Sequence, residues 1–174
     1  MTEGRNVCRI AILCSFDLSL LPRRIVRELG AFSLHAECYL APFNQHYIVA
    51  LQEGSALYEF KPDMVVFFID VEDILGDMLA APLDFDSARI DRRVAEAFSD
   101  LRHALAAVRK ALPRAQILVH NFSLTSSPST GILDLNISLS IDSAVVALNR
   151  YLLDLAGTLD LTLLDYAGFV RRHG

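Results

Sequence analysis

The apolar run from Val7 to Ser15 (VCRIAILCS) constrains the fold more than any other feature of this sequence. It is long enough for a strand and too short for a helix. A strand that is apolar on both faces is typical of a parallel sheet, because helices cover both sides of such a sheet. Met64 to Ile69 (MVVFFI) shows the same pattern with more β-branched and aromatic residues. We therefore expect a buried parallel sheet.

Strand-like and helix-like segments alternate along the whole chain. Three further short runs resemble strands: 35–40, 116–120 and 161–164. Longer segments with apolar residues three or four apart predict helices: one from a Ser19 cap to Gly30, one over 87–112 and one over 142–156, ended by Gly157. This alternation implies right-handed crossovers in an α/β fold, a three-layer α/β/α sandwich. Five such strands suit the flavodoxin-like order 2-1-3-4-5.

Length and composition fit one globular domain over residues 1–174, with 53% hydrophobic and 21% charged residues. A net charge of −5 without a basic stripe disfavours nucleic-acid binding. We find no signal-peptide pattern and no apolar run long enough to span a membrane. The three cysteines are expected to be free thiols, so the predicted location is the cytoplasm. No cofactor or metal is expected in this chain.

Polar residues follow every predicted strand. Ligands of open α/β sheets bind beyond the carboxyl ends of the strands, so these residues are the candidate binding residues. They are Ser15, Asp17, Asn44, Gln45, Asp70, Glu72, Asp73, His120 and Asn121. Helix caps occupy the same positions in many proteins, so each residue also has a purely structural interpretation.

Two groups among them could carry chemistry. Asp70, Glu72 and Asp73 could hold a metal or act as a general base, but capping of the following helix is the favoured interpretation. Ser15, Asp17 and His120 are the catalytic candidates, as nucleophile, orienting residue and base. No glycine-rich elbow surrounds Ser15, and a catalytic serine also needs an oxyanion hole. We therefore do not favour a working Ser-His pair.

Asp84-Phe85-Asp86-Ser87 is superficially similar to the Asp-x-Asp nucleophile loop of haloacid-dehalogenase (HAD) phosphotransferases. That loop follows a hydrophobic strand, whereas the residues preceding Asp84 are short and broken by proline. We interpret the segment as the start of a helix capped by Asp86 or Ser87.

Three stretches resemble the N-terminal domain of FkbH-like proteins. They are Ala11–Leu21 (AILCSFDLSLL), Ser55–Leu75 (SALYEFKPDMVVFFIDVEDIL), and ILVHNF together with the later ALNRYLLDLA and LTLLDYAGFVRRHG. The resemblance covers nearly the whole chain and implies an SGNH-hydrolase-like fold. In the family this domain precedes a HAD-type phosphatase domain, in which a Mg ion is expected. The family is associated with glyceryl transfer from 1,3-bisphosphoglycerate to an acyl carrier protein, which supplies polyketide extender units.

Compared with SGNH hydrolases, this sequence departs from three required positions. Phe16 stands where the Gly-Asp-Ser nucleophile is expected. Glu72 replaces an asparagine that would donate to an oxyanion, and a carboxylate there would repel developing negative charge. Gly168 occupies the histidine position of an Asp-x-x-His that would begin at Asp165.

The leading hypothesis is an accessory, non-catalytic SGNH-like domain of an FkbH-type protein that recognises a substrate or a carrier protein. Its expected partners are a HAD-type phosphatase domain, in cis or in trans, and possibly an acyl carrier protein. The alternative is a divergent SGNH-type hydrolase or acyltransferase that uses the polar rim. A structural or dimerisation module is third.

Overall fold

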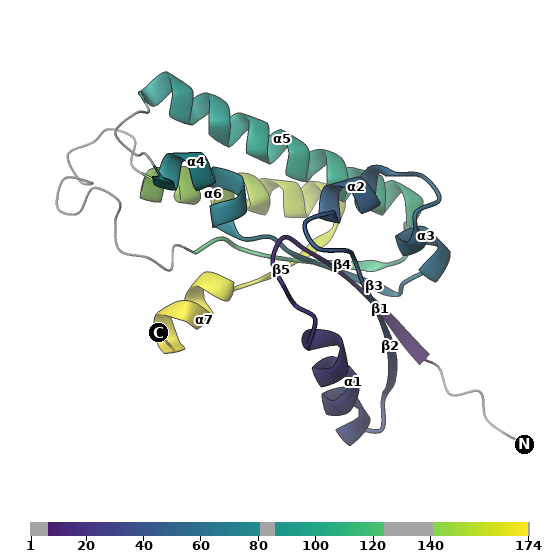
Figure 1. Ribbon diagram of the computed structural model, residues 1–174. Coiled ribbons are helices and arrows are strands. Elements are labelled where there is room, and N and C mark those ends of the chain that lie inside the picture. Colours follow the sequence, from purple (N-terminus) through teal and green to yellow (C-terminus); the bar gives the residue numbers. More distant parts are fainter. Residues whose placement is uncertain (1–6, 81–85, 124–140, 174) are drawn as a thin grey trace, which may run out of the picture. The chain divides into compact units, whose positions relative to one another are not determined.

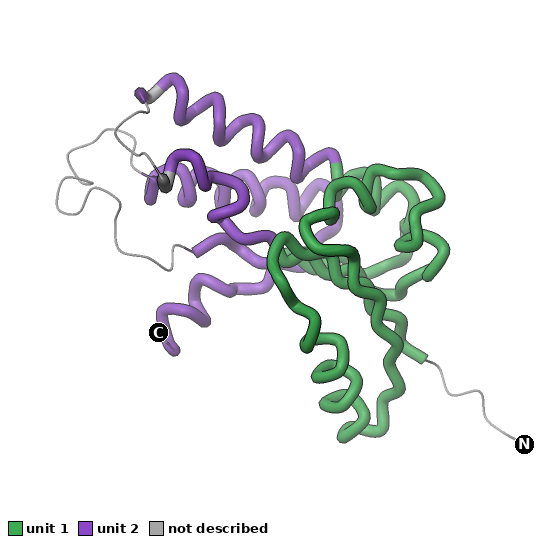
Figure 2. Tube along the Cα trace, viewed as in Figure 1, with its two compact units in different colours: residues 1–68, 104–119 green, residues 69–103, 120–174 purple. Residues whose placement is uncertain are grey.

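The computed structural model describes residues 7–80, 86–123 and 141–173. Within it the chain forms two compact units, each assembled from separate stretches of sequence (Figure 2). The first unit contains 1–68 and 104–119, and the second contains 69–103 and 120–174. The expected single domain over 1–174 stays a prediction, and each unit is described by itself below.

The first unit contains most of the sheet. Its strands are β1 (Val7–Cys14), β2 (His35–Leu40), β3 (Met64–Phe68) and most of β4 (Gln116–His120). β1 pairs in parallel with both β2 and β3, and β3 pairs in parallel with β4. With β5 (Leu161–Leu164), the strand order is β2-β1-β3-β4-β5 (Figure 1). The predicted fold class and strand order are therefore confirmed.

Helix α1 (Leu21–Ala31) covers one face of the sheet in the first unit. It packs against a cluster formed by Ile10, Ile12 and Val66. None of its residues, all of which are described, is itself buried, so this face is thinly covered. The predicted Ser19 cap is wrong: Leu20 occupies the N-cap position, and the Ser19 amide instead donates to Asp17 Oδ1 over 2.9 Å.

The opposite face of the sheet also carries fully buried side chains. Leu13, Phe67 and Ile117 lie there at 0% exposure. Helices α2 (His46–Leu51) and α3 (Ala56–Phe60) lie on this side, together with the C-terminal part of α5 (Ser87–Ala111) (Figure 1). The short α3 was not predicted from the sequence.

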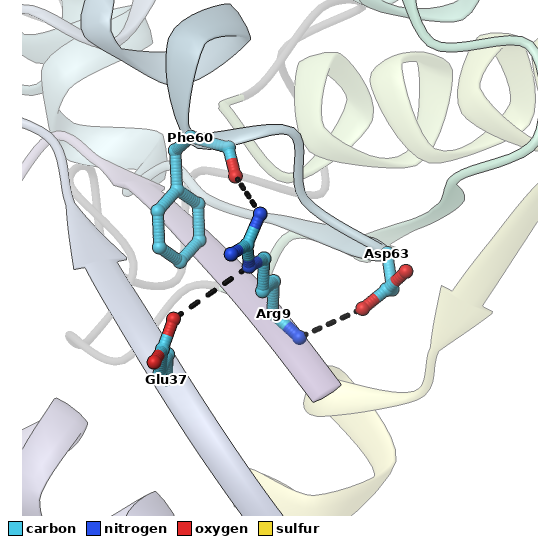
Figure 3. A network of polar contacts seen from close by, with 4 residues as sticks. All are labelled: Arg9, Glu37, Phe60 and Asp63. Atoms are coloured by element: carbon cyan, nitrogen blue, oxygen red, sulfur yellow. Dashed lines mark hydrogen bonds and ion pairs between the residues drawn. The ribbon is translucent and has the colours of Figure 1, made fainter. Parts of the chain in front are cut away.

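Contacts made by Arg9 and Asp63 stabilise the amino edge of the sheet, where the strands begin (Figure 3). The Arg9 amide donates to Asp63 Oδ2 over 2.8 Å, and the Asp63 amide donates to the Arg9 carbonyl over 2.8 Å. The Arg9 guanidinium lies 3.6 Å from Glu37 on β2, and its carbon lies 5.9 Å from the centre of the Phe60 ring. These contacts link β1 to β2 and to the residue that precedes β3.

The second unit contains helices α4 (Val71–Ala80), α6 (Ile141–Leu159) and α7 (Tyr166–His173), with strand β5 and residues 87–103 of α5. Helix α6 continues past Gly157, so the predicted end at that glycine is wrong. A helix interior tolerates glycine at a cost of roughly 1 kcal/mol, which packing of the apolar face can offset. The Ser/Thr/Pro-rich loop predicted over 123–131 lies almost wholly outside the described residues.

Two further sequence predictions can be compared with the structure. Asp86 Oδ1 accepts the Arg89 amide hydrogen over 2.8 Å, so the predicted cap of α5 is confirmed; residues 84 and 85 lie outside the described part. The cysteines at 8, 14 and 38 are free thiols, as expected. Among the described residues, no helix is long and apolar enough to cross a membrane.

Candidate functional site

Ser15 directly follows the carboxyl end of β1 and is buried in the sheet. Its amide donates to the Phe68 carbonyl over 3.0 Å, which extends the pairing of β1 with β3. The residue is only 2% exposed. Asp17 is exposed, and its carboxylate accepts the Ser19 amide hydrogen in a local turn. Asp17 therefore stabilises the turn that leads into α1.

Cys14 is the other nucleophilic side chain at this end of β1. It is 2% exposed, and burial raises the pKa of its thiol. The nearby negative charge of Asp17 raises that pKa further. Because the thiolate and not the thiol is the nucleophile, Cys14 is unsuited to covalent catalysis here.

Asn44 and Gln45 form the turn after β2. Asn44 has a positive φ of 54°, which asparagine tolerates better than most residues. Gln45 is the N-cap residue of α2 without a side-chain capping bond, and its amide donates to the Pro42 carbonyl over 3.1 Å. Both side chains are exposed and could contact a ligand.

Asp70 begins helix α4 in the second unit. Its Oδ1 accepts the Glu72 amide hydrogen over 3.0 Å, and its carbonyl accepts that of Asp73 over 3.2 Å. Glu72 and Asp73 are exposed in the first turn, where carboxylates favour the positive end of a helix. No described group of three or more His, Cys, Asp or Glu side chains is arranged to hold a metal ion.

Both ring nitrogens of His120 bind the backbone. Nε2 accepts the Ile69 amide hydrogen over 3.2 Å, and Nδ1 lies 2.8 Å from the Asn121 carbonyl, to which it must donate. These two bonds select the neutral tautomer with its proton on Nδ1. Burial lowers the pKa of His120, although the Asn121 bond and the charge of Asp70 oppose that effect. The ring is therefore held neutral in a structural role.

Asn121 and Asp165 together cap helix α7. The Asn121 side chain donates to Asp165 Oδ1 over 3.0 Å and accepts the Ala167 amide hydrogen over 2.8 Å. Asp165 Oδ1 also accepts the Gly168 amide hydrogen over 2.9 Å. The Asn121 side-chain bond, followed by the Gly168 bond, lowers the pKa of Asp165, and Arg171 and Arg172 add smaller effects. The carboxylate is ionised and held in place.

Gly168 lies so close to this carboxylate that a larger residue would displace it. A Cβ at position 168 would lie 2.0 Å from Asp165 Oδ2. A histidine at this position would therefore push Asp165 away from its two donors. With glycine at 168, Asp165 serves as part of the α7 cap, and a side chain at 168 would require the Asp165 carboxylate to move.

Asn149 is a residue to which sequence reasoning gave no role. Its side chain accepts the Phe122 amide hydrogen over 2.7 Å and donates to the Phe122 carbonyl over 2.9 Å. It thus satisfies the backbone just beyond β4 in place of a neighbouring strand. The sequence does contain a signal for this role: Asn149 is a polar residue next to Leu148, which is buried on the inner face of α6.

The second unit therefore brings together His120, Asn121, Asp165 and Tyr166, whose ring centroid lies 5.1 Å from that of His120. Ser15, Asp17, Asn44 and Gln45 belong to the first unit (Figure 2). The catalytic grouping of Ser15, Asp17 and His120 therefore stays a hypothesis. The hydrogen bonds of His120 and Asp165 show what these residues do for the fold.

Comparison of the sequence with protein-family models and with curated proteins finds no match. Comparison of the structure does find similar folds. One is the N-terminal part of the protein BF1531 from Bacteroides fragilis, which contains a phosphatase domain and was solved with Mg. It aligns over 97% of this chain with a TM-score of 0.80 and 16% identity. The present chain spans 43% of the length of that structure.

Two esterase-type structures are also similar. The acetyl xylan esterase AlAXEase aligns over 95% of this chain and 80% of its own, with a TM-score of 0.62 and 12% identity. A GDSL-like lipase from Parabacteroides merdae aligns over 95% and 82%, with a TM-score of 0.61 and 16% identity. The expected SGNH-hydrolase-like fold is therefore confirmed, and it is shared with a protein that also contains a phosphatase domain.

Proposed function

We propose that this chain is a non-catalytic recognition domain with the SGNH-hydrolase fold that works beside a HAD-type phosphatase domain, as in FkbH-type proteins. The observation that carries the proposal is the bonding of His120, whose two ring nitrogens serve the backbone of Ile69 and Asn121. A general base needs a free nitrogen within reach of the proton that it removes. The neutral, backbone-bound ring of His120 has no such nitrogen.

The cap of α7 supports the same proposal. Hydrolases of this fold take their base from an Asp-x-x-His after the last strand, whereas here glycine stands at 168 and its amide donates to Asp165, whose carboxylate occupies the position beside it. The similarity to BF1531 supports a phosphatase-type partner domain, because that protein carries one in the same chain. The glyceryl transfer and polyketide roles follow from the sequence resemblance alone and belong to this proposal, as does a cytoplasmic location.

We expect no hydrolytic activity from this chain. With p-nitrophenyl acetate and a glyceryl thioester as substrates, turnover should not exceed that of the Ser15→Ala variant. A fluorophosphonate probe should leave Ser15 unlabelled, because the residue is only 2% exposed and labelling needs an accessible hydroxyl beside a base. Intact-mass spectrometry of the labelled protein measures this directly.

The alternative function is a divergent hydrolase or acyltransferase, and the same experiment distinguishes it. Stoichiometric labelling of Ser15, lost in both Ser15→Ala and His120→Gln, would establish that alternative. A serine esterase of known activity, treated in parallel, shows that the probe is reactive.

If a carrier protein is recognised, the end of α7 suits it better than the acidic start of α4. Acyl carrier proteins are acidic, and like charges facing each other across an interface are costly. Glu72 and Asp73 would therefore repel such a partner. The last turn of α7 presents Arg171 and Arg172 beside Phe169, which is 52% exposed.

We accordingly expect glyceryl- and apo-carrier protein to bind this chain through α7. Replacement of Arg171 and Arg172 by alanine should weaken binding about tenfold at low salt, as loss of rim charges does. Isothermal titration calorimetry measures the change. The matched control is Arg23→Ala with Arg24→Ala, which removes an equal charge from α1. Equal losses in the two double variants, or no binding by the wild-type chain, would refute a carrier contact at α7.

A further inference from the structure

The first unit contains a cavity of about 570 Å³ between the α2–α3 segment and the C-terminal part of α5. Its volume lies within the usual range of sites for small ligands, roughly 300–1,000 Å³. The wall is mainly apolar, and its polar side chains are few. The lining residues comprise Ala50, Leu51, Tyr58, Ala107, Ala111 and Leu112, with the charged Glu53, Lys61 and Lys110 and the turn residue Gly54.

Within the first unit, this cavity lies at the opposite edge of the sheet from Ser15. Lys61 comes three residues before β3, and Leu112 comes four residues before β4. Both therefore belong to the amino edge of a parallel sheet, whereas Ser15 follows the carboxyl end of β1. The inference below is independent of the proposed function.

Both lysines of the chain line this cavity. The sequence has 16 basic residues, and all of them except Lys61 and Lys110 are arginines. A lysine ammonium is a compact, mobile point charge, whereas a guanidinium is a planar fork suited to paired hydrogen bonds. Within the described part of the chain, neither lysine side chain takes part in a hydrogen bond or an ion pair. Two positive charges without an ion-paired partner among the described residues thus lie at the border of an apolar cavity, with Glu53 in the same lining.

The backbone at Lys61 strengthens this observation. Its φ is 50° and its ψ is 61°, a left-handed conformation in which glycine is usually preferred. A residue with a Cβ is less favourable in this conformation than glycine is. Because the turn itself does not require lysine, the side chain is better explained by a use outside the turn.

The walls are held in place by buried hydrogen bonds. The Tyr58 hydroxyl donates to the Ala50 carbonyl, and Ser55 Oγ donates to the Val49 carbonyl over 2.7 Å, so α3 is tied to α2. On the α5 side, the Arg109 guanidinium donates to the Ala115 carbonyl over 2.8 Å and holds the end of the helix. The site is thus formed before a ligand arrives, which lowers the entropic cost of binding.

We propose that this cavity binds a small organic anion, with its apolar body against Ala107 and Ala111 and its carboxylate or phosphate between Lys61 and Lys110. Glu53 lies in the same lining and opposes the binding of an anion. The two lysines outweigh it, so the lining has a net positive charge in a chain whose net charge is −5. Glu53 disfavours ligands with extended or multiple negative charge.

The small number of lysines makes a direct test possible. Reductive methylation with ¹³C-formaldehyde labels only Lys61, Lys110 and the terminal amine, and it preserves their charge. Titration with hexyl phosphate and, separately, with hexanoate should move both lysine signals in ¹H–¹³C spectra in a saturable way, while the terminal amine stays still. Hexan-1-ol and inorganic phosphate should each bind about tenfold more weakly. Hexan-1-ol keeps only the apolar contact with the cavity, and inorganic phosphate keeps only the attraction to the lysines.

Variants then separate the charge from the cavity. Lys61→Gly relieves the left-handed backbone, so a loss of affinity in this variant does not reflect unfolding. Combined with Lys110→Gln it should weaken hexyl phosphate binding about tenfold, measured by calorimetry. Arg102→Gln is the control for Lys110→Gln alone, because each removes one charge from the same helix, and it should not weaken binding. Ala111→Phe should block the cavity, and Glu53→Gln should tighten binding at least about twofold.

Each outcome decides the proposal. Saturable binding of either anion that is lost in the lysine and Ala111→Phe variants supports it, and the preferred anion identifies the head group. Equal movement of the terminal amine would show non-specific attraction and would overturn it. So would binding that survives Ala111→Phe, equal affinity for hexan-1-ol, or no binding of either anion up to its solubility limit.

Discussion

His120→Ala is expected to lower the free energy of unfolding by about 2–4 kcal/mol. The substitution removes a buried ring that is 6% exposed and leaves the Ile69 amide hydrogen without its acceptor. It also removes the donor to the Asn121 carbonyl and the packing against Tyr166. Urea denaturation followed by circular dichroism measures the change. If His120 were instead a free catalytic base, its loss would abolish an activity and leave stability nearly unchanged.

His103→Ala is the matched control, because His103 is exposed on α5 and its removal should change stability by no more than about 0.5 kcal/mol. Comparable losses in the two variants would contradict a structural role specific to His120.

The same residue predicts a pH dependence. The pKa of His120 is lowered in the folded state, so above the ordinary histidine pKa of about 6.5 its stabilising contribution is complete. As the pH falls below that value the unfolded chain takes up the proton first, and stability declines until the pH reaches the folded pKa. The slope between about pH 6.5 and that lower pKa should disappear in His120→Gln. An unchanged slope would assign it to other groups.

Phe67→Ala should cause the largest loss of stability in the sheet, about 3–5 kcal/mol. The side chain is fully buried in β3, between Leu13 of β1 and Val119 of β4. Removal of the ring costs its transfer from water and leaves a cavity that the paired strands cannot close. For a small protein whose total stability is about 5–15 kcal/mol, this variant should be close to unfolded. Its denaturation midpoint in urea measures the effect.

Phe68→Ala is the matched control, because the neighbouring side chain points to the opposite face of the same strand. That face is the one that α1 covers thinly, and Phe68 is only partly buried in its cluster. We expect a loss no more than about half that of Phe67→Ala. An equal or larger loss would show that the α1 side is the main core.

The sequence segment that carries the family resemblance most specifically, Ser55–Leu75, has structural explanations for many of its polar residues. Ser55 and Tyr58 tie α3 to α2, Asp63 pairs with the Arg9 backbone, and Asp70 begins α4. The polar residues of this segment therefore stabilise the sheet and the helices next to it. The segment does not by itself identify a reaction, which is why the functional proposal rests on His120 and the cap of α7 instead.

Much of the fold could be predicted because it is encoded locally. The apolar runs of β1 and β3 and the periodicity of α5 are visible within each segment of the sequence. The order 2-1-3-4-5 follows from general rules for connections in α/β folds. Local signals failed where packing decides. Gly157 has the usual features of a helix end, yet α6 continues to Leu159 because its inner face is buried at Leu152 and Leu155. Ser19 is a residue type that commonly caps helices, yet here its amide donates to the Asp17 carboxylate in a local turn, and Leu20 takes the N-cap position of α1.

Taken alone, the sequence determined the class of fold, the strands, and the polar residues at their carboxyl ends, because continuous apolar runs, helical periodicity and short-range turn chemistry are properties of neighbouring residues. Only the tertiary structure decided what those polar residues do. The neutral ring of His120 depends on the Ile69 amide 51 residues away, and the cap of Asp165 depends on Asn121 44 residues away. The two lysines, 49 residues apart, likewise meet only at a cavity that the α2–α3 segment and the C-terminal part of α5 line together. Contacts between residues so distant in sequence leave no periodic trace that a single chain can show.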